Sequence, residues 1–242
     1  MKRFIALVYA VVCYGLFFAT FLYAIGFLAN LGVPKSIDSG PAAPFRTALM
    51  IDLLLLGLFA VQHSVMARPE FKRWWAQIVP RPIERSTYVL LASLALILLF
   101  SQWRPLTNVI WHVDNPVVAG LLYALSGFGW FTVLFSTFLI NHFDLFGLRQ
   151  VYLRLRGQPH TELGFRTPFL YKFIRHPIML GFLMAFWFTP HMTVGHILFA
   201  GMTSAYILIA VQLEERDLLH YFGDAYREYR KRTPRFIPRL LK

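Results

Sequence analysis

Hydrophobic residues are gathered along this chain in blocks of about 20, the length that an α-helix needs to cross the hydrocarbon core of a membrane. Loops rich in glycine, proline and polar residues separate the blocks. The blocks predict helices over Phe4–Leu31, Phe45–Ala67, Ser86–Trp103, Val117–Ile140, Ile178–Thr189 and His196–Leu213. The fifth would be about 18 Å long, too short to span comfortably, so we expect it to form a helical hairpin with the sixth. The pattern predicts an all-α integral membrane protein with five to six transmembrane helices.

A further helix is expected after the sixth block, with apolar and basic residues on opposite faces. Such an amphipathic helix lies on a membrane surface, with its apolar side at the headgroups; here the surface would be the cytoplasmic one. Its apolar face would hold Leu218, Phe222, Ala225 and Tyr229, and its polar face Arg227, Arg230 and Lys231.

Composition agrees with a membrane-embedded chain. Of 242 residues, 57% are hydrophobic and 15% are charged, against about 45–50% and about 25% in soluble domains. We expect one polytopic membrane domain over residues 1–242. The single cysteine, Cys13, lies in an apolar block, so we interpret it as a small buried residue without a disulfide partner. The first block is too long for the hydrophobic region of a signal peptide, so we expect it to be retained.

The basic residues border the apolar blocks and fall mostly on one predicted side. The net charge is +12, and this placement favours anionic lipid headgroups as partners. No DNA- or RNA-binding motif is present, so no nucleic-acid partner is expected. With a cytoplasmic N-terminus and six crossings, 21 of the 24 Lys and Arg residues would be cytoplasmic, as the positive-inside rule requires. Both termini, with the loop Arg68–Arg85 and the segment Arg216–Lys242, are expected in the cytoplasm, and Lys35, Arg46 and Arg104 on the opposite side.

Ionisable residues cluster at four of the predicted helix ends on the cytoplasmic side. Ionisable groups at membrane depth are costly, and they usually pair with one another or serve a site. The alternative is that they are ordinary interfacial residues. The four groups are His63 in segment two, His142 and Asp144 after segment four, Arg175 and His176 before segment five, and Glu214 and Glu215 after segment six.

The C-terminal third carries an ordered set of motifs. Tyr171-Lys-Phe-Ile-Arg175-His176-Pro177 opens the hairpin, and Gly181 follows. After the hairpin come Glu214-Glu215, then Gly223-Asp-Ala-Tyr226-Arg-Glu-Tyr229, and finally Pro234-Arg-Phe-Ile-Pro238. This order resembles the isoprenylcysteine carboxyl methyltransferase superfamily of membrane enzymes over residues 168–238. One position departs from that pattern, because Met179 stands where the superfamily often has an aromatic residue.

Motifs in the rest of the chain resemble one bacterial branch of that superfamily, the methanethiol S-methyltransferases. These motifs are Val33–Asp38, Ala60–Pro69, Pro82–Tyr88 and Phe138–Gln150. The resemblance implies methylation of a small thiol, methanethiol, to dimethyl sulfide, with S-adenosyl-L-methionine as methyl donor. It also implies a bacterial inner-membrane protein whose active site faces the cytoplasm.

Residues 168–238 would then bind the methyl donor. Carboxylates would bind its ribose or ammonium group, and Arg175 its carboxylate, by bidentate pairing. Pro177 would set the first turn of the hairpin. Tyr226 and Tyr229, one helical turn apart, would form an aromatic wall or else pack against the membrane. The expected cofactor-binding residues are Tyr171, Arg175, His176, Pro177, Gly181, Glu214, Glu215, Tyr226 and Tyr229.

The acceptor must lose a proton, because a thiolate is the nucleophile. His142 is our first candidate for the proton acceptor, oriented by Asp144, and His63 is the second. His142 could equally satisfy the last carbonyl groups of segment four. No metal site is expected, because His191 and His196 lack the spacing of helical metal ligands, and His112, His160 and His220 fall in loops or at interfaces.

Two other functions remain open on the sequence. One is methylation of a different acceptor, such as a lipid-linked thiol or an isoprenyl carboxylate. The other is a non-catalytic membrane protein that binds or transports a ligand.

Overall fold

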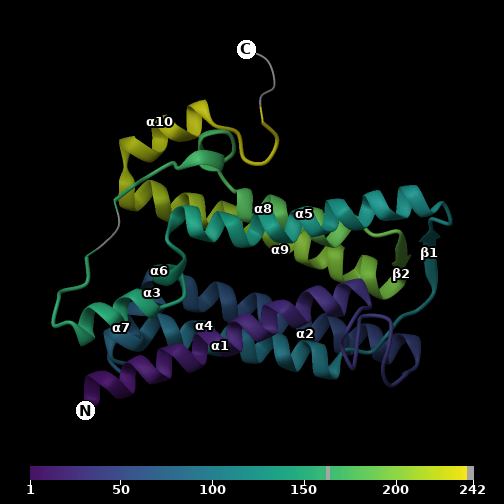
Figure 1. The fold of residues 1–242 in the computed structure, drawn as a ribbon, viewed down its shortest axis with the longest axis horizontal. Coiled ribbons are helices and arrows are strands. Elements are labelled where there is room, and N and C mark those ends of the chain that lie inside the picture. The colour runs from purple at the N-terminus through teal and green to yellow at the C-terminus, as the bar shows by residue number, and fades with distance from the viewer. Residues whose placement is uncertain (162–163, 239–242) are drawn as a thin grey trace. The chain divides into compact units, whose positions relative to one another are not determined.

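The computed structural model describes residues 1–161 and 164–238 (Figure 1). Arg239–Lys242, which end the predicted cytoplasmic segment Arg216–Lys242, lie outside the described residues. The chain divides into two compact units. Unit 1 comprises Met1–Val109, His142–Thr161 and Thr193–His196, and unit 2 comprises Ile110–Asn141, Glu162–Met192 and Ile197–Lys242.

The elements are helical except for two short strands. Five helices among the described residues, α1, α2, α4, α5 and α9, are long and apolar enough to cross a membrane, and α8 is a shorter apolar helix. The expected all-α integral membrane fold with five to six transmembrane helices is confirmed. In chain order the elements are α1 (Lys2–Ala29), α2 (Phe45–Ala67), α3 (Pro69–Trp75), α4 (Arg81–Gln102), β1 (Val109–His112), α5 (Pro116–Ile140), α6 (His142–Leu145), α7 (Leu148–Leu155), η1 (Phe169–Lys172), α8 (Pro177–Trp187), β2 (His191–Thr193), α9 (Val194–Phe222) and α10 (Asp224–Arg232).

In unit 1, α4 packs against both α1 and α2, and the short helix α7 packs against α1 and α4 (Figure 1). A close approach at Gly147 attaches the α6–α7 segment to α4. Gly147 has φ 87°, and a Cβ there would lie 2.7 Å from the backbone nitrogen of Ser86. Only glycine tolerates both the positive φ and that contact. The segment that carries His142 is therefore fixed on the first turns of α4.

In unit 2, α5 and α8 pack closely through two glycines. A Cβ on Gly181 would lie 2.7 Å from the carbonyl oxygen of Gly129, and a Cβ on Gly129 would lie 2.6 Å from that of Gly181. Small residues at such positions let two helix backbones approach within a membrane. The hydroxyl of Ser126 donates to the carbonyl of Ala185 at 2.9 Å, so the two helices run antiparallel. Gly181, expected at the cofactor site, serves this helix contact.

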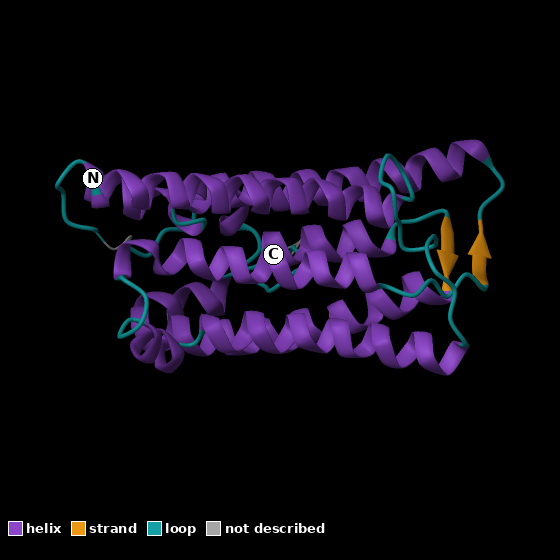
Figure 2. Ribbon diagram, turned by 90° about the horizontal axis from the view of Figure 1, so that it is seen from below, coloured by secondary structure: helices purple, strands orange, loops and turns teal. Residues whose placement is uncertain are grey.

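The backbone after α8 continues to the end of unit 2 where β1 lies. The indole nitrogen of Trp111 donates to the carbonyl of Thr189 at 3.1 Å, and the amide of Val113 to that of Pro190 at 2.9 Å. β1 and β2 form a two-stranded sheet, drawn as arrows in Figure 2. Strand β1 lies between the predicted helices Ser86–Trp103 and Val117–Ile140, where no element was expected.

The end of α9 differs from the prediction. The sixth helix was expected to stop at Leu213, but α9 continues to Phe222, so Glu214 and Glu215 lie inside a helix. The amphipathic helix that was expected to include both Leu218 and Tyr229 is wrong as one element. Gly223, with φ 54° and ψ −123°, separates α9 from α10. A glycine is needed there because other residues rarely adopt that backbone conformation.

Candidate functional site

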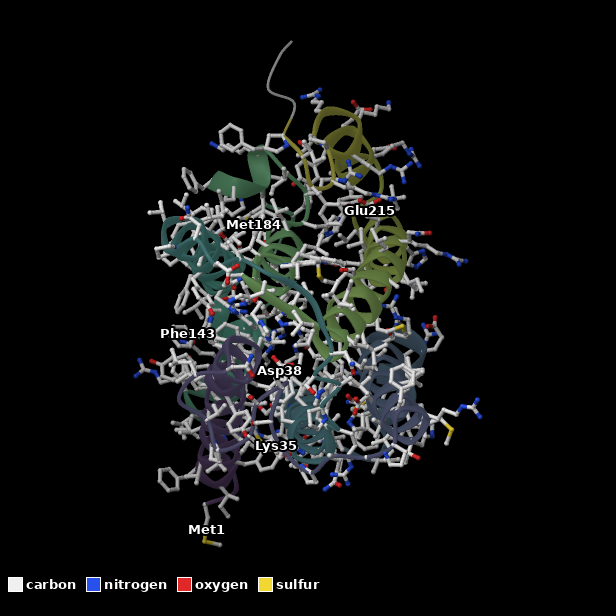
Figure 3. The ribbon with its side chains drawn as sticks, turned by 90° about the vertical axis from the view of Figure 1, so that its right-hand side faces the viewer. Met1, Lys35, Asp38, Phe143, Met184 and Glu215 are labelled. Atoms are coloured by element: carbon white, nitrogen blue, oxygen red, sulfur yellow. The ribbon has the colours of Figure 1, made fainter. Side chains whose placement is uncertain are left out.

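Three side chains converge on the carboxylate of Glu215, which is buried in α9 and labelled in Figure 3. Arg175 approaches one oxygen, Oε1, with Nε at 2.9 Å and Nη2 at 2.8 Å. The imidazole Nε2 of His176 lies 3.1 Å from the same oxygen. Arg235 reaches the other oxygen, with Nη2 3.0 Å from Oε2. A buried charge is tolerated when it is paired and hydrogen-bonded in this way.

The two neighbouring glutamates have different environments. The side chain of Glu215 is 3% exposed, whereas that of Glu214 is 47% exposed. The Oε2 atom of Glu214 lies 3.7 Å from Nδ1 of His176. The imidazole of His176 therefore faces one carboxylate on each ring nitrogen. Of the two, Glu214 is the carboxylate that a ligand can reach.

Arg175 is held by backbone groups as well as by Glu215. Its Nη1 donates to the carbonyl of Arg230 at 3.0 Å and also to the carbonyl of Thr233. The side chain is 8% exposed. Most of the N–H donors of Arg175 are thus bonded to protein groups. We therefore interpret Arg175 as a residue that holds other parts of the site in place.

The segment after α10 folds back onto the start of α8. The backbone amides of Arg175 and His176 donate to the carbonyls of Pro234 and Arg235, at 2.9 and 3.2 Å. His176 is the N-cap residue of α8, and Pro177 occupies the first turn, as expected for a residue that sets the direction of a helix. Sequence reasoning missed Arg235 as a site residue. Arg235 lies in the Pro234–Pro238 motif, which the sequence analysis recognised. The spacing of that motif does not show which residue Arg235 contacts.

Aromatic residues lie beside this ion cluster. Tyr226 and Tyr229 of α10 have ring centroids 5.8 Å apart, and Phe165 lies 5.8 and 5.3 Å from them. The hydroxyl of Tyr229 donates to the carbonyl of Tyr171 at 2.5 Å. Burial raises the pKa of Tyr229 to about 12 and raises the pKa values of Tyr171 and Tyr226 as well. These phenols therefore remain protonated and can donate hydrogen bonds.

Tyr226 is 1% exposed, yet its hydroxyl has no hydrogen-bond partner among the described residues. Leaving a buried hydroxyl unpaired is costly. Such a group is typical of a site completed by a ligand. Tyr226 and Glu214 are thus the two groups of unit 2 best suited to a bound molecule.

His142 lies in unit 1, where it contacts α1. It is 2% exposed, and its Nε2 atom lies 2.9 Å from the hydroxyl of Tyr14. The ring of Phe146 packs against it with centroids 4.8 Å apart. Burial lowers the pKa of His142 below its ordinary value, so the ring is neutral and able to accept a proton at neutral pH. Sequence reasoning missed Tyr14, because one tyrosine in an apolar block carries no signal of its partner.

Asp144 contacts the segment that follows it in the chain. One oxygen, Oδ1, accepts from Nη1 of Arg149 at 2.9 Å and lies 3.2 Å from Nε2 of His160. Arg149 also donates to the backbone and side chain of Thr161. Asp144 thus anchors the segment that follows it, and its expected role in orienting the His142 ring stays a prediction.

His63 is paired with a tyrosine of α4. The hydroxyl of Tyr88 lies 2.9 Å from Nε2 of His63, and the guanidinium of Arg85 lies 5.0 Å from the centre of the Tyr88 ring. Nε of Arg85 donates to the carbonyl of Leu145 at 2.7 Å. The His63 pair and the segment after His142 thus contact the same two turns of α4. All three expected catalytic residues, His142, Asp144 and His63, lie in unit 1.

The expected residues therefore form two sets. Tyr171, Arg175, His176, Glu214, Glu215, Tyr226 and Tyr229 are brought together within unit 2. Residues 1–161 and 164–238 contain no group of three or more His, Cys, Asp or Glu arranged to hold a metal ion.

Five long apolar helices among the described residues define a polytopic membrane protein, and its unit 2 carries a buried ion cluster beside an aromatic group. The chain is 56% identical over 238 residues to the methanethiol S-methyltransferase of Mycobacterium tuberculosis, covering 98% of both chains. It is 57% identical over 236 residues to methanethiol S-methyltransferase 1 of Bradyrhizobium diazoefficiens, covering 98% of this chain and 83% of that one. The methanethiol S-methyltransferase of Crocosphaera subtropica is 52% identical over 238 residues, covering 98% and 93%. No family model matches the chain, and no solved structure matches it.

This chain belongs to the methanethiol S-methyltransferase family, and it is an integral membrane enzyme of the methyltransferase class. The resemblance drawn from its motifs is confirmed.

Proposed function

We propose that this protein transfers a methyl group from S-adenosyl-L-methionine to methanethiol, giving dimethyl sulfide. The observation that carries the proposal is the conjunction, in unit 2, of a reachable carboxylate, an unpaired buried hydroxyl and an aromatic group around one ion cluster. The extensive identity to relatives named for this reaction supports the same acceptor.

The groups present fit the chemistry of this donor. The donor carries an ammonium group, a ribose diol, a carboxylate and an adenine ring, and a site for it needs a few convergent polar groups among apolar walls. Glu214 can accept from the ammonium or the diol, and the Tyr226 hydroxyl can donate to an acceptor of the ligand. Phe165 and Tyr229 offer aromatic surface for a ring. When bound, S-adenosyl-L-methionine supplies the methyl group that a thiolate sulfur receives, and S-adenosyl-L-homocysteine leaves.

The chain's own part in the reaction is positioning and proton removal. Arg175, His176 and Arg235 hold Glu215, and through it the turn that presents Glu214. The thiol loses its proton in two linked transfers: the Tyr14 hydroxyl takes the proton of the thiol as it gives its own proton to Nε2 of His142. The lowered pKa of His142 keeps that nitrogen unprotonated until it is needed.

A headspace assay tests the proposed function. Purified protein in detergent, given S-adenosyl-L-methionine and methanethiol, should release dimethyl sulfide. Turnover with a lipid-linked thiol or an isoprenyl carboxylate, and none with methanethiol, would reassign the acceptor. Donor binding without turnover of any of these acceptors would instead favour a non-catalytic ligand-binding role.

We further propose that the protein lies in the bacterial inner membrane, with both termini and the Arg175–Glu215 cluster in the cytoplasm. The distribution of basic residues supports this orientation. Single cysteines placed at Ser39 and at Thr107, each in a Cys13→Ala background, should react with a membrane-impermeant reagent in intact cells. If both cysteines react only after lysis, the orientation is the reverse of the one proposed. If only one of them reacts in intact cells, the number of membrane crossings differs from six.

A further inference from the structure

Two histidines face each other at the β1–β2 end of unit 2, where the proposed methyl transfer gives them no role. We propose that His112 and His191 are the protein ligands of a divalent transition-metal site, for a cation of the zinc, nickel or copper class. The inference does not depend on the proposed function, because it concerns the end of α5 and α8 opposite to Arg175.

The distance between the two ring nitrogens suits a shared metal. Nδ1 of His112 lies 3.0 Å from Nδ1 of His191, with the rings at 75° to each other. Two nitrogens that each bind Zn²⁺ at 2.0–2.1 Å lie roughly 2.9–3.4 Å apart, for angles between 90° and 109° at the metal. Imidazole is a ligand that zinc, copper and nickel share. The pair therefore needs little movement to admit a metal ion between its rings.

Metal-binding histidines usually donate a hydrogen bond from their second ring nitrogen to a carboxylate, a carbonyl group or water. Asp114 is placed to accept this hydrogen bond from His112. Its Oδ1 atom lies 3.4 Å from Nε2 of His112, the ring nitrogen that points away from His191. A carboxylate in that position accepts a hydrogen bond from the Nε2–H group, which leaves the lone pair on Nδ1 for the metal. Half of the His112 side chain is exposed, at 54%, so a hydrated ion can reach the pair and water can fill the remaining coordination positions.

The backbone holds the pair in place. The amide of Val113 donates to the carbonyl of Pro190, next to the two histidines on both strands. The hydroxyl of Thr189 donates to the carbonyl of His191 at 3.0 Å. Residues opposite each other on neighbouring antiparallel strands have side chains close enough to interact directly. A metal bound by both rings would join β1 to β2.

No pattern in the sequence indicates this site. His191 was compared with His196, five residues away, and that spacing does not suit helical ligands. Its partner His112 lies 79 residues away, and strand pairing alone places the two side by side. Most metal centres have at least three protein ligands, and this site would have two. Because so few ligands hold the metal, its affinity should depend measurably on the hydrogen bond from His112 to Asp114.

Calorimetric titration with ZnCl₂ tests the site, using full-length protein in detergent, purified without a polyhistidine tag and treated with a chelator. We expect one Zn²⁺ per chain in the wild type and loss of that binding in His112→Ala and in His191→Ala. Asp114→Asn should weaken it by about 10- to 100-fold, as for other outer contacts. The exposed His220 supplies the control, and His220→Ala should bind as the wild type does.

The fold of each variant is checked by dimethyl sulfide release, which should match the wild type because neither histidine belongs to the proposed reaction. Zn²⁺ binding that is equal in the wild type and in a His112→Ala/His191→Ala double variant would overturn the proposal. The absence of binding in the wild type would also overturn it, and the pair would then be a hydrogen bond between two imidazoles. Full binding by Asp114→Asn would remove Asp114 from the site.

Discussion

The two units handle charge in opposite ways. In unit 2, the buried carboxylate of Glu215 is met by two guanidinium groups and an imidazole, so its negative charge is compensated by the groups around it. In unit 1, the buried imidazole of His142 is met by a phenol and by phenylalanine rings. The first environment fixes a geometry. The second leaves one group uncharged and ready to take a proton. The proposed reaction uses both environments.

This difference predicts which substitutions affect the fold and which affect the chemistry alone. Changes in the compensated cluster leave buried charges without partners. Changes at the histidine–phenol pair should leave the fold intact and remove the proposed proton acceptor.

The largest effect is expected for Glu215→Gln. The amide would leave Arg175 with a reduced counter-charge in a buried position, and breaking a buried ion pair typically costs about 3–5 kcal/mol. We expect a lower free energy of unfolding, measured by urea denaturation in detergent, and loss of donor binding. Wild-type stability in this variant would show that the cluster does not support the fold.

The next effect is expected for His142→Ala, which should lower the methyl-transfer rate by about 10²–10⁴ with donor affinity unchanged. The rate of the variant should recover as pH rises, because solvent then supplies thiolate. Since burial lowers the pKa of His142, the acid limb of the wild-type rate profile should lie below about pH 6.5, the ordinary value for histidine.

His63→Ala is the matched control, because His63 also contacts a tyrosine hydroxyl in unit 1. A pH-dependent defect in His63→Ala and none in His142→Ala would transfer the role to His63. Tyr14→Phe should reproduce part of the His142→Ala defect if the hydroxyl carries the proton. Flat profiles in all three variants would remove histidine from the mechanism.

A smaller effect is expected for Glu214→Gln. Its half-exposed carboxylate should lose a charged hydrogen bond to the donor, worth roughly 1.5–3 kcal/mol, or about 10- to 150-fold in the dissociation constant. The free energy of unfolding should not change, in contrast to Glu215→Gln. Titration calorimetry with S-adenosyl-L-methionine measures the first quantity, and unchanged affinity would exclude Glu214 from the donor site.

The sequence was sufficient for the membrane-spanning helices, because blocks of apolar residues and their proline and glycine borders are local signals. The predicted helix Phe45–Ala67 matches α2 residue for residue. The break at Gly223 was missed, because the apolar positions on both sides keep a helical period while the break depends on one backbone conformation. Strand β1 was missed because its four residues acquire their structure from β2, far along the chain.

For the site, motif order was enough to gather the residues of unit 2 but not to rank them. Glu214 and Glu215 are adjacent in sequence, and only the direction in which α9 presents each one distinguishes the reachable carboxylate from the buried one. Asp144 was expected to orient His142 because the two are neighbours in sequence. Its contacts with Arg149 and His160 could not be predicted in that way, because they depend on how α7 and the loop after it fold.

The smallest effect is expected from a matched pair of conservative changes at the same carboxylate, Arg175→Lys and Arg235→Lys. The Arg235 side chain is 45% exposed, and ion pairs of partly solvated groups are worth about 0.2–1 kcal/mol. Arg235→Lys should therefore raise the dissociation constant of the donor by less than about fivefold. It should lower the free energy of unfolding by less than about 1 kcal/mol. Arg175→Lys keeps the charge as well, but a lysine cannot reproduce a guanidinium that also donates to the carbonyls of Arg230 and Thr233. It should cost more in both measurements, which are donor titration and urea denaturation. Equal effects of the two changes would mean that charge alone holds Glu215, and that the segment after α10 is kept in place by its backbone hydrogen bonds to Arg175 and His176.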